Sequence, residues 1–230
     1  MRFMSDRVRG WTRRSSPAVL LAACSIIAVA SPAGAHPHVF VDAKAEMVFD
    51  ASGKVTAIRN VWRFDDAYSA FASQGLDADG DGKLSVEELK PLADVNVESL
   101  KDFAYFTFLA AGDRDIDFDA PTEYWIQWDE GFLTLYFTLP TKGAVEIRGL
   151  PAKLEVYDPT YYVAFNFVET EPVALDNAPK GCTLEVIRPQ ELDAATAATL
   201  AEIPPDQREI PDELAIVTQD LTNGASVRCP

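Results

Sequence analysis

The sequence predicts an α+β fold that is mainly β: an antiparallel β-sandwich-like domain with an inserted single EF-hand helical segment and a short C-terminal helix. After residue 35, most of the chain consists of short runs in which apolar and polar residues alternate, as in half-buried strands. One acidic stretch, 77–88, has the spacing of a calcium-binding EF-hand loop. An alanine-rich stretch near the C-terminus indicates a helix.

The first 35 residues have the features of a secretory signal peptide. A basic region is followed by an apolar run over 17–30 and by the small residues Ala33-Gly34-Ala35. Cleavage there would leave a single periplasmic domain, 36–230. The stretch 21–24, Leu-Ala-Ala-Cys, offers a lipoprotein site as an alternative. We favour the cleaved peptide because the apolar run before that cysteine is very short.

The mature chain would be strongly acidic. Residues 1–35 carry five arginines and one aspartate, a charge of +4, and the whole chain carries −16, so residues 36–230 carry −20. This balance excludes a general nucleic-acid-binding role, which needs a basic face. It suits a protein that binds cations, although acidity alone often serves only solubility.

The first elements are predicted to be a β-hairpin and a helical insertion. Alternation over 39–49, a turn at 50–53 and a return over 54–64 indicate two paired strands. Asp65 and Asp66 are suited to cap the helix that follows. A proline is expected to kink or shorten the helix after the loop. The insertion spans about 66–103, and its predicted helical parts are 67–76, a helix starting near 86, and 97–103.

The rest of the chain is predicted to form short strands separated by turns that contain Gly, Pro and Asp, which favours a β-sandwich. A helix over 191–201 is ended by Pro204-Pro205, and a last strand follows near 225–229. The predicted strands between the insertion and that helix are 105–109, 124–128, 132–139, 144–148, 154–157, 161–168 and 182–187.

The acidic stretch supplies hard oxygen ligands at the spacing that calcium needs. Glycine at loop position 6, Gly82, allows the sharp turn, and the single unpaired loop indicates a structural role for calcium. The predicted calcium ligands are Asp77, Asp79, Asp81, the Lys83 carbonyl, Ser85 and the bidentate carboxylate of Glu88.

The two histidines of the chain, His36 and His38, both stand at the predicted mature N-terminus. On a strand they would share one face with Asp42. Imidazole is a common ligand of transition metals, and zinc, nickel, cobalt and copper all remain open. The alternative is a chance pair at a frayed terminus. The carboxylates predicted to complete the site are Asp42, Asp65, Asp66 and Asp158.

The mature chain would retain two cysteines, Cys182 and Cys229. An even pair in an exported protein favours a disulfide. Since each cysteine borders a predicted strand, we expect the bridge to join two adjacent strands.

Five stretches of the chain form a recognisable set: His36–Asp42, Val61–Ser69, the acidic loop, Tyr105–Thr107 and Tyr157–Tyr162. With these stretches the chain resembles a bacterial family of periplasmic proteins, described as the periplasmic component of an uncharacterised ABC-type transport system. The resemblance covers essentially the whole mature chain. Its members commonly occur beside nickel/cobalt-type permeases, and some are implicated in zinc acquisition. The resemblance therefore implies a periplasmic accessory to transition-metal transport, with an inner-membrane metal permease as partner.

Three classes of function remain to be compared. We favour a metal-binding accessory, a chaperone or permease partner for zinc or for nickel and cobalt, stabilised by calcium. The first alternative is a calcium-stabilised structural or interaction module. The second is a copper enzyme with an N-terminal histidine chelate. We do not expect an enzyme, because the sequence has no Gly-x-Ser-x-Gly elbow and no phosphate-binding loop.

Overall fold

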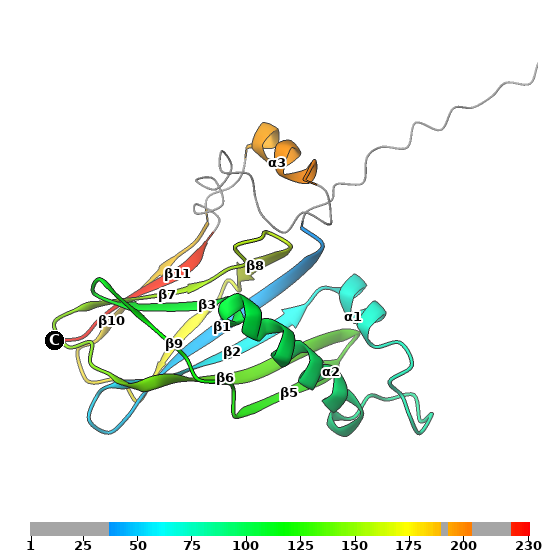
Figure 1. Cartoon of the computed structure of the whole chain (residues 1–230), viewed down its shortest axis with the longest axis horizontal. Coiled ribbons are helices and arrows are strands. Elements are labelled where there is room, and N and C mark those ends of the chain that lie inside the picture. Colours follow the sequence, from blue (N-terminus) through cyan, green and yellow to red (C-terminus); the bar gives the residue numbers. More distant parts are fainter. Residues whose placement is uncertain (1–36, 190–192, 204–221) are drawn as a thin grey trace, which may run out of the picture. The chain divides into compact units, whose positions relative to one another are not determined.

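The computed structural model describes residues 37–189, 193–203 and 222–230, which belong to one unit, Ala33–Pro230. The predicted signal peptide and His36 lie outside the described residues. Two β-sheets form the domain, and their inward side chains belong to one buried apolar cluster (Figure 1). The mainly β α+β class predicted from the sequence is confirmed.

The first sheet has six strands in the order β5-β6-β2-β1-β8, and β9 also pairs with β1. Both β8 and β9 run parallel to β1, so this sheet is mixed, whereas the sequence predicts an antiparallel sandwich. Parallel partners need a long connection, and here strands of the second sheet intervene along the chain. The strands are β1 (Val39–Phe49), β2 (Val55–Phe64), β5 (Glu123–Asp129), β6 (Phe132–Val145), β8 (Val163–Phe167) and β9 (Val173–Asp176).

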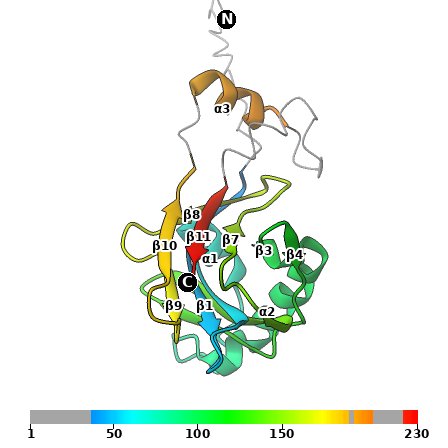
Figure 2. The same ribbon diagram turned by 90° about the vertical axis from the view of Figure 1, so that its left-hand side faces the viewer.

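The second sheet is antiparallel throughout and has the order β10-β11-β7-β3-β4. Figure 2 shows these strands following one another across the view in that order. Their inward residues alternate with exposed ones, as expected for a sheet with one buried face. The strands are β3 (Thr107–Ala111), β4 (Arg114–Ile116), β7 (Pro151–Val156), β10 (Thr183–Ile187) and β11 (Asn223–Arg228).

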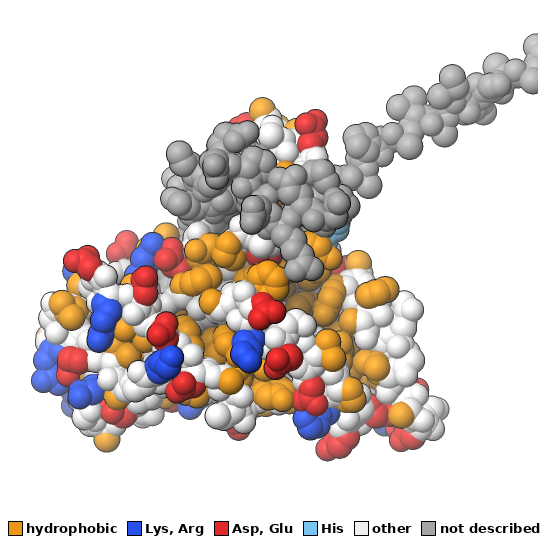
Figure 3. All heavy atoms as spheres, viewed as in Figure 1, with side chains coloured by type: hydrophobic (Ala, Val, Ile, Leu, Met, Phe, Trp, Pro, Cys, Tyr) orange, Lys and Arg blue, Asp and Glu red, His pale blue; other side chains and the backbone are white. Residues whose placement is uncertain are grey.

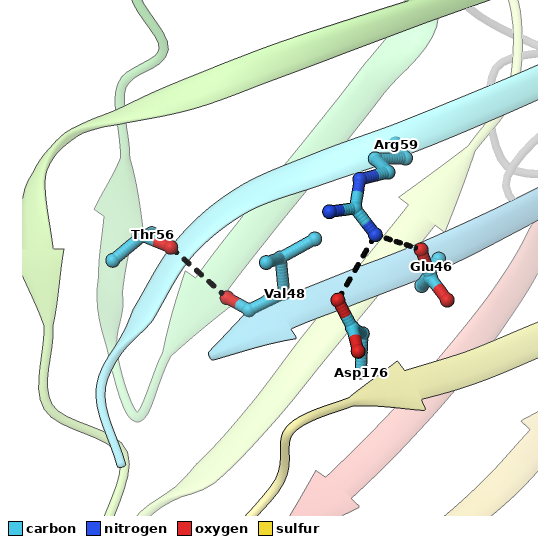
Figure 4. A network of polar contacts seen from close by, with 5 residues as sticks. All are labelled: Glu46, Val48, Thr56, Arg59 and Asp176. Carbon is cyan, nitrogen blue, oxygen red and sulfur yellow. Dashed lines mark hydrogen bonds and ion pairs between the residues drawn. The ribbon is translucent and has the colours of Figure 1, made fainter. Parts of the chain in front are cut away.

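The outer face of the first sheet is bound together by an arginine. The Nη1 of Arg59 on β2 donates to Glu46 on β1 and to Asp176 on β9, so one guanidinium spans three strands (Figure 4). Thr56, at the point where the β2–β6 register shifts, donates its hydroxyl to the Val48 carbonyl at 3.4 Å. These contacts fix the register of the β1–β2 hairpin near its turn.

The two sheets are also joined by a buried amide. The Nδ2 of Asn223 on β11 donates to the Phe165 carbonyl at 2.6 Å, and its Oδ1 accepts from the Phe167 N–H at 3.0 Å. Both partners lie on β8, whose backbone groups on that side would otherwise be unpaired. Arg188 adds bonds from its guanidinium to the Phe167 and Val168 carbonyls. Asn223 and Arg188 thus provide hydrogen-bond partners for backbone groups of β8 at this edge of the first sheet.

A helical segment stands between β2 and β3. It contains α1 (Asp66–Ala72), α2 (Val86–Leu100) and the 3-10 helix η1 (Lys101–Phe106). The sequence predicts that Pro91 kinks or shortens the second helix and that another starts at 97; the shortening and the separate helix are wrong, because α2 runs through Pro91 to Leu100. A capping box at Ser85 starts it, and Leu89, Ala93 and Val97, spaced four residues apart, bury one face in the core.

Several boundaries differ from the prediction. Residues 105 and 106 do not belong to a strand; Ala104, Tyr105 and Phe106 have φ of 51°, 54° and 46°, in the left-handed region that non-glycine residues seldom adopt. Burial of Tyr105 and Phe106 offsets this cost. Of the stretch predicted as a strand over 144–148, only 144 and 145 belong to β6, and the sequence does not predict β4 and β9. The C-terminal helix is α3 (Ala194–Ala201).

Cys182 and Cys229 form the predicted disulfide. Cys182 precedes β10 and Cys229 follows β11, so the bridge joins the ends of two neighbouring strands. Within the described parts of the chain, no helix has the length and apolar composition needed to span a bilayer.

The Asn223 contact makes a prediction about stability. Asn223→Leu leaves the Phe165 carbonyl and the Phe167 N–H buried without partners, and should lower the free energy of unfolding by roughly 2–4 kcal/mol. Urea unfolding measures this, with the exposed Asn166→Ala on β8 as the control, which should change stability by less than about 0.5 kcal/mol. Equal effects of the two substitutions would show that the amide does not hold the sheets together.

Candidate metal sites

The acidic loop between α1 and α2 gathers three carboxylates. One oxygen each from Asp77, Asp79 and Asp81 lie within 4.8 Å of one another. Among residues 37–189, 193–203 and 222–230, these three form the one group of at least three His, Cys, Asp or Glu side chains with ligand atoms this close. Acidic side chains are visible at the lower right of Figure 3, around the place where the loop lies in Figure 1.

Backbone N–H groups hold these carboxylates in place. Asp77 Oδ1 accepts from Gly80 and Asp81 at 2.8 and 3.1 Å, and its Oδ2 accepts from Gly82 at 3.0 Å. Asp79 accepts in turn from the Asp81 N–H at 3.0 Å. Gly80 and Gly82 have φ of +75° and +80°, which a side chain would strain, so the glycines let the loop wind around the first aspartate.

The other predicted calcium ligands lie where the loop meets α2. Ser85 caps α2, accepting from the Glu88 N–H, and donates its own hydroxyl to Glu88. Lys83 donates its backbone N–H to Asp81 at 2.8 Å, which leaves its carbonyl as the predicted ligand atom.

Glu88 connects α2 with the start of the loop. One carboxylate oxygen accepts from the Ala78 N–H at 2.8 Å, and the other accepts from the Ser85 N–H at 2.9 Å. These bonds, those from Ser85 foremost, lower the pKa of Glu88 to about 2. The carboxylate is therefore charged near neutral pH. It lies beside the loop, where its partners are N–H and O–H donors.

The N-terminal end of β1 holds the second candidate site. His38 is exposed and directly precedes β1; its backbone N–H donates to the Tyr162 carbonyl at 2.8 Å. The imidazole stacks on the Tyr162 ring with 4.6 Å between centroids. This contact follows from the parallel pairing of β1 with β8, which continues the register Val39↔Val163 back to these two residues. Tyr162 was not predicted as part of a site.

The predicted carboxylate partners of His38 already have other roles. Asp65 caps α1 through the Tyr68 N–H and also accepts from the Phe40 N–H on β1. Asp158 is buried and accepts from the N–H and hydroxyl of Thr160 and from the Val163 N–H. Both carboxylates thus organise the chain around the start of β1.

The remaining two carboxylates are exposed. Asp42 forms an ion pair with Arg63 at 3.5 Å, and Asp66 accepts from the N–H of Ala67 in the first turn of α1. Within the described ranges none of the four carboxylates joins His38 in a three-ligand group. The predicted shell therefore stays a prediction, and its second histidine lies outside those ranges.

Both candidate sites fall inside one family match. A family model described as "Protein of unknown function (DUF1007)" matches residues 21–229. The chain belongs to this family.

Two curated relatives are similar to this DUF1007 chain. An "Uncharacterized protein" from Haemophilus influenzae is 25% identical over 185 residues, covering 80% of this chain and 87% of the relative. An "Uncharacterized 15.5 kDa protein in trpE 3'region" from Spirochaeta aurantia is 29% identical over 99 residues, covering 43% of this chain and 70% of the relative. These names assign no ligand to either site.

The low pKa of Glu88 makes a prediction about acid stability of the DUF1007 chain without calcium. A carboxylate with a pKa lowered from 4.5 to about 2 stabilises the fold above pH 4.5, and this contribution is lost as pH falls through 2. The difference in melting temperature between wild type and Glu88→Ala should therefore be largest near pH 5–6 and shrink toward pH 2. A difference that stays constant between pH 6 and pH 2 would contradict the assigned hydrogen bonds.

Proposed function

We propose that this DUF1007 protein is a calcium-stabilised metal-binding accessory protein of the periplasm. In this proposal the 77–88 loop holds calcium, and the N-terminal histidines bind a late divalent metal for an inner-membrane permease. The observation that carries the proposal is the loop itself, in which three carboxylates at positions 1, 3 and 5 come within 4.8 Å of one another.

Calcium suits the chemistry of this loop. All its donors are hard oxygens, which calcium prefers, and it takes six to eight of them in flexible geometry. Three neighbouring carboxylates repel one another, and a dication would relieve that repulsion. The hydrogen bonds to Asp77 already orient its oxygens, so less conformational freedom is lost on binding. On binding, the Glu88 carboxylate would give up its hydrogen bonds from backbone N–H groups and coordinate the ion instead.

The position of the loop supports a structural role for calcium. The loop joins α1 to α2, and the Tyr68 hydroxyl on α1 donates to Asn96 on α2 at 3.3 Å. The α2 helix is in turn held on β5 by the Tyr124 hydroxyl, which donates to Asp94 at 2.9 Å. An ion in the loop would bind where α1 ends and α2 begins. Together with these contacts it would stabilise the helical segment between β2 and β3.

The N-terminal site supports binding of a softer metal. His38 presents an exposed imidazole whose ring plane is set by Tyr162, and imidazole suits zinc, nickel, cobalt and copper. We place zinc or nickel there because of the permease association that the family resemblance implies. The disulfide is in keeping with export, since disulfides persist in oxidising compartments.

The main alternative is a calcium-stabilised structural or interaction module without a transition-metal role. It would keep the calcium loop and leave the histidines without metal. A copper enzyme would use the same histidines but add turnover of a substrate. Metal affinity at the histidines therefore distinguishes the proposal from the first alternative, and catalytic turnover distinguishes it from the second.

The calcium part predicts a change in thermal stability. A ligand at 100 times its Kd stabilises the native state by about 2.7 kcal/mol, which for a domain of this size raises the melting temperature by roughly 5–10 °C. Glu88→Gln should remove most of that rise. The neighbouring Glu87→Gln, at loop position 11, is the matched control and should keep it. Equal calcium responses in the two variants would count against the assigned ligand.

The proposed histidine site predicts that the protein binds zinc or nickel. Calorimetric titration measures this binding, with saturating calcium present so that the loop is already filled. The His36→Ala, His38→Ala double variant should lose this binding. Tyr162→Ala should weaken it several-fold by freeing the His38 ring, whereas Tyr162→Phe, which keeps the stack, should retain it. Unchanged affinity in the double variant would show that the histidines are not ligands.

A further inference from the structure

Two polar side chains in the core of the domain lack hydrogen-bond partners. Asn60 and Trp62 lie on β2 and are each only 1% exposed. Neither the Nδ2 nor the Oδ1 of Asn60 has a partner, and neither has the Nε1 of Trp62. These are the buried side-chain N and O atoms without a partner among the described residues. Three such atoms from two residues of one strand therefore need an explanation.

The cost of this arrangement is high for a folded protein. Leaving a buried polar group without a partner costs about 1–3 kcal/mol. The same core contains a second buried amide, Asn223, and both of its polar atoms are bonded to β8. The fold can therefore satisfy an amide at the border between the sheets, whereas the cross-strand partners of Asn60, Ala45 and Phe137, have apolar side chains.

Asn60 and Trp62 share one face of β2, and both lie beside small residues of β1. Residues two apart on a strand point to the same face, so Asn60 and Trp62 both face the space between the sheets. On β1, which runs beside β2 in Figure 1, their cross-strand partners are Ala45 and Ala43. Alanine fills less of the space next to the amide and the indole than the larger residues on β6, Phe137 and Leu135.

We propose that Asn60 and Trp62 form an internal binding site for one water molecule. A buried water needs two to four polar partners, and these side chains offer an indole N–H, an amide N–H2 and an amide oxygen. The water would accept a hydrogen bond from Trp62 Nε1–H and donate one to Asn60 Oδ1. This site is separate from both metal sites, and its existence does not depend on the proposed function.

A crystal structure of the wild-type protein at about 1.5 Å tests the site directly. We expect electron density for a single water within about 3.2 Å of both Trp62 Nε1 and an Asn60 side-chain atom. Asn60 and Trp62 contacting only carbon atoms would overturn the proposal. Density for a larger molecule at this place would overturn it as well.

Solution NMR gives a second readout. In the wild type the Trp62 indole proton should show a cross-peak to a long-lived water, and Asn60→Leu should abolish it because the second partner of the water is lost. The indole protons of Trp125 and Trp128, which are partly exposed, are the internal controls and should not change. A Trp62 cross-peak that persists in Asn60→Leu would contradict the shared site.

Discussion

The packing around the Trp62 ring is the constraint on which the rest of this fold depends. The ring contacts Phe137 of β6 and Phe165 of β8 edge-on, at 4.7 and 4.8 Å between centroids, and stacks more distantly on Phe106 at the end of the helical segment. The Trp62 side chain thus contacts β6 and β8, which lie on opposite sides of β2 in the first sheet, and also the residue that precedes β3 of the second sheet. Burial of this cluster fixes how the helical segment returns to the core and offsets the left-handed turn that ends at Phe106.

From that core, contacts continue to both candidate metal sites. Asp65 directly follows β2, and its two oxygens hold the first turn of α1 and the Phe40 N–H of β1. Tyr68 on α1 is partly buried, and loss of solvent around its hydroxyl raises its pKa; this hydroxyl donates to Asn96 on α2. The start of β1, where His38 stacks on Tyr162, and the helices that flank the acidic loop are therefore attached to the same end of β2.

Much of this arrangement could be predicted from the sequence, because the signals are local. The alternation of apolar and polar residues predicts β1 and β2, and the spacing of glycines and aspartates predicts the acidic loop. Two cysteines beside predicted strands indicate the disulfide. The parallel pairing of β8 with β1 could not be predicted, since it depends on tertiary contacts far apart in the chain. For the same reason the sequence does not reveal the stacking of Tyr162 on His38, or the backbone N–H groups that bind the Asp65 and Asp158 carboxylates. Pro91 was misjudged because buried Leu89 and Ala93 outweigh its missing hydrogen bond.

We propose that this domain holds two different metals, a hard cation in the loop and a late divalent metal at its N-terminus. Elemental analysis tests it most directly, on protein exported to the periplasm and purified without chelator or added metal. We expect about one calcium per chain together with zinc or nickel, and loss of the zinc or nickel alone when His36 and His38 are replaced by alanine. Protein that lacks either calcium or a late divalent metal, and does not take up the missing metal when it is supplied, would show that the domain does not hold both.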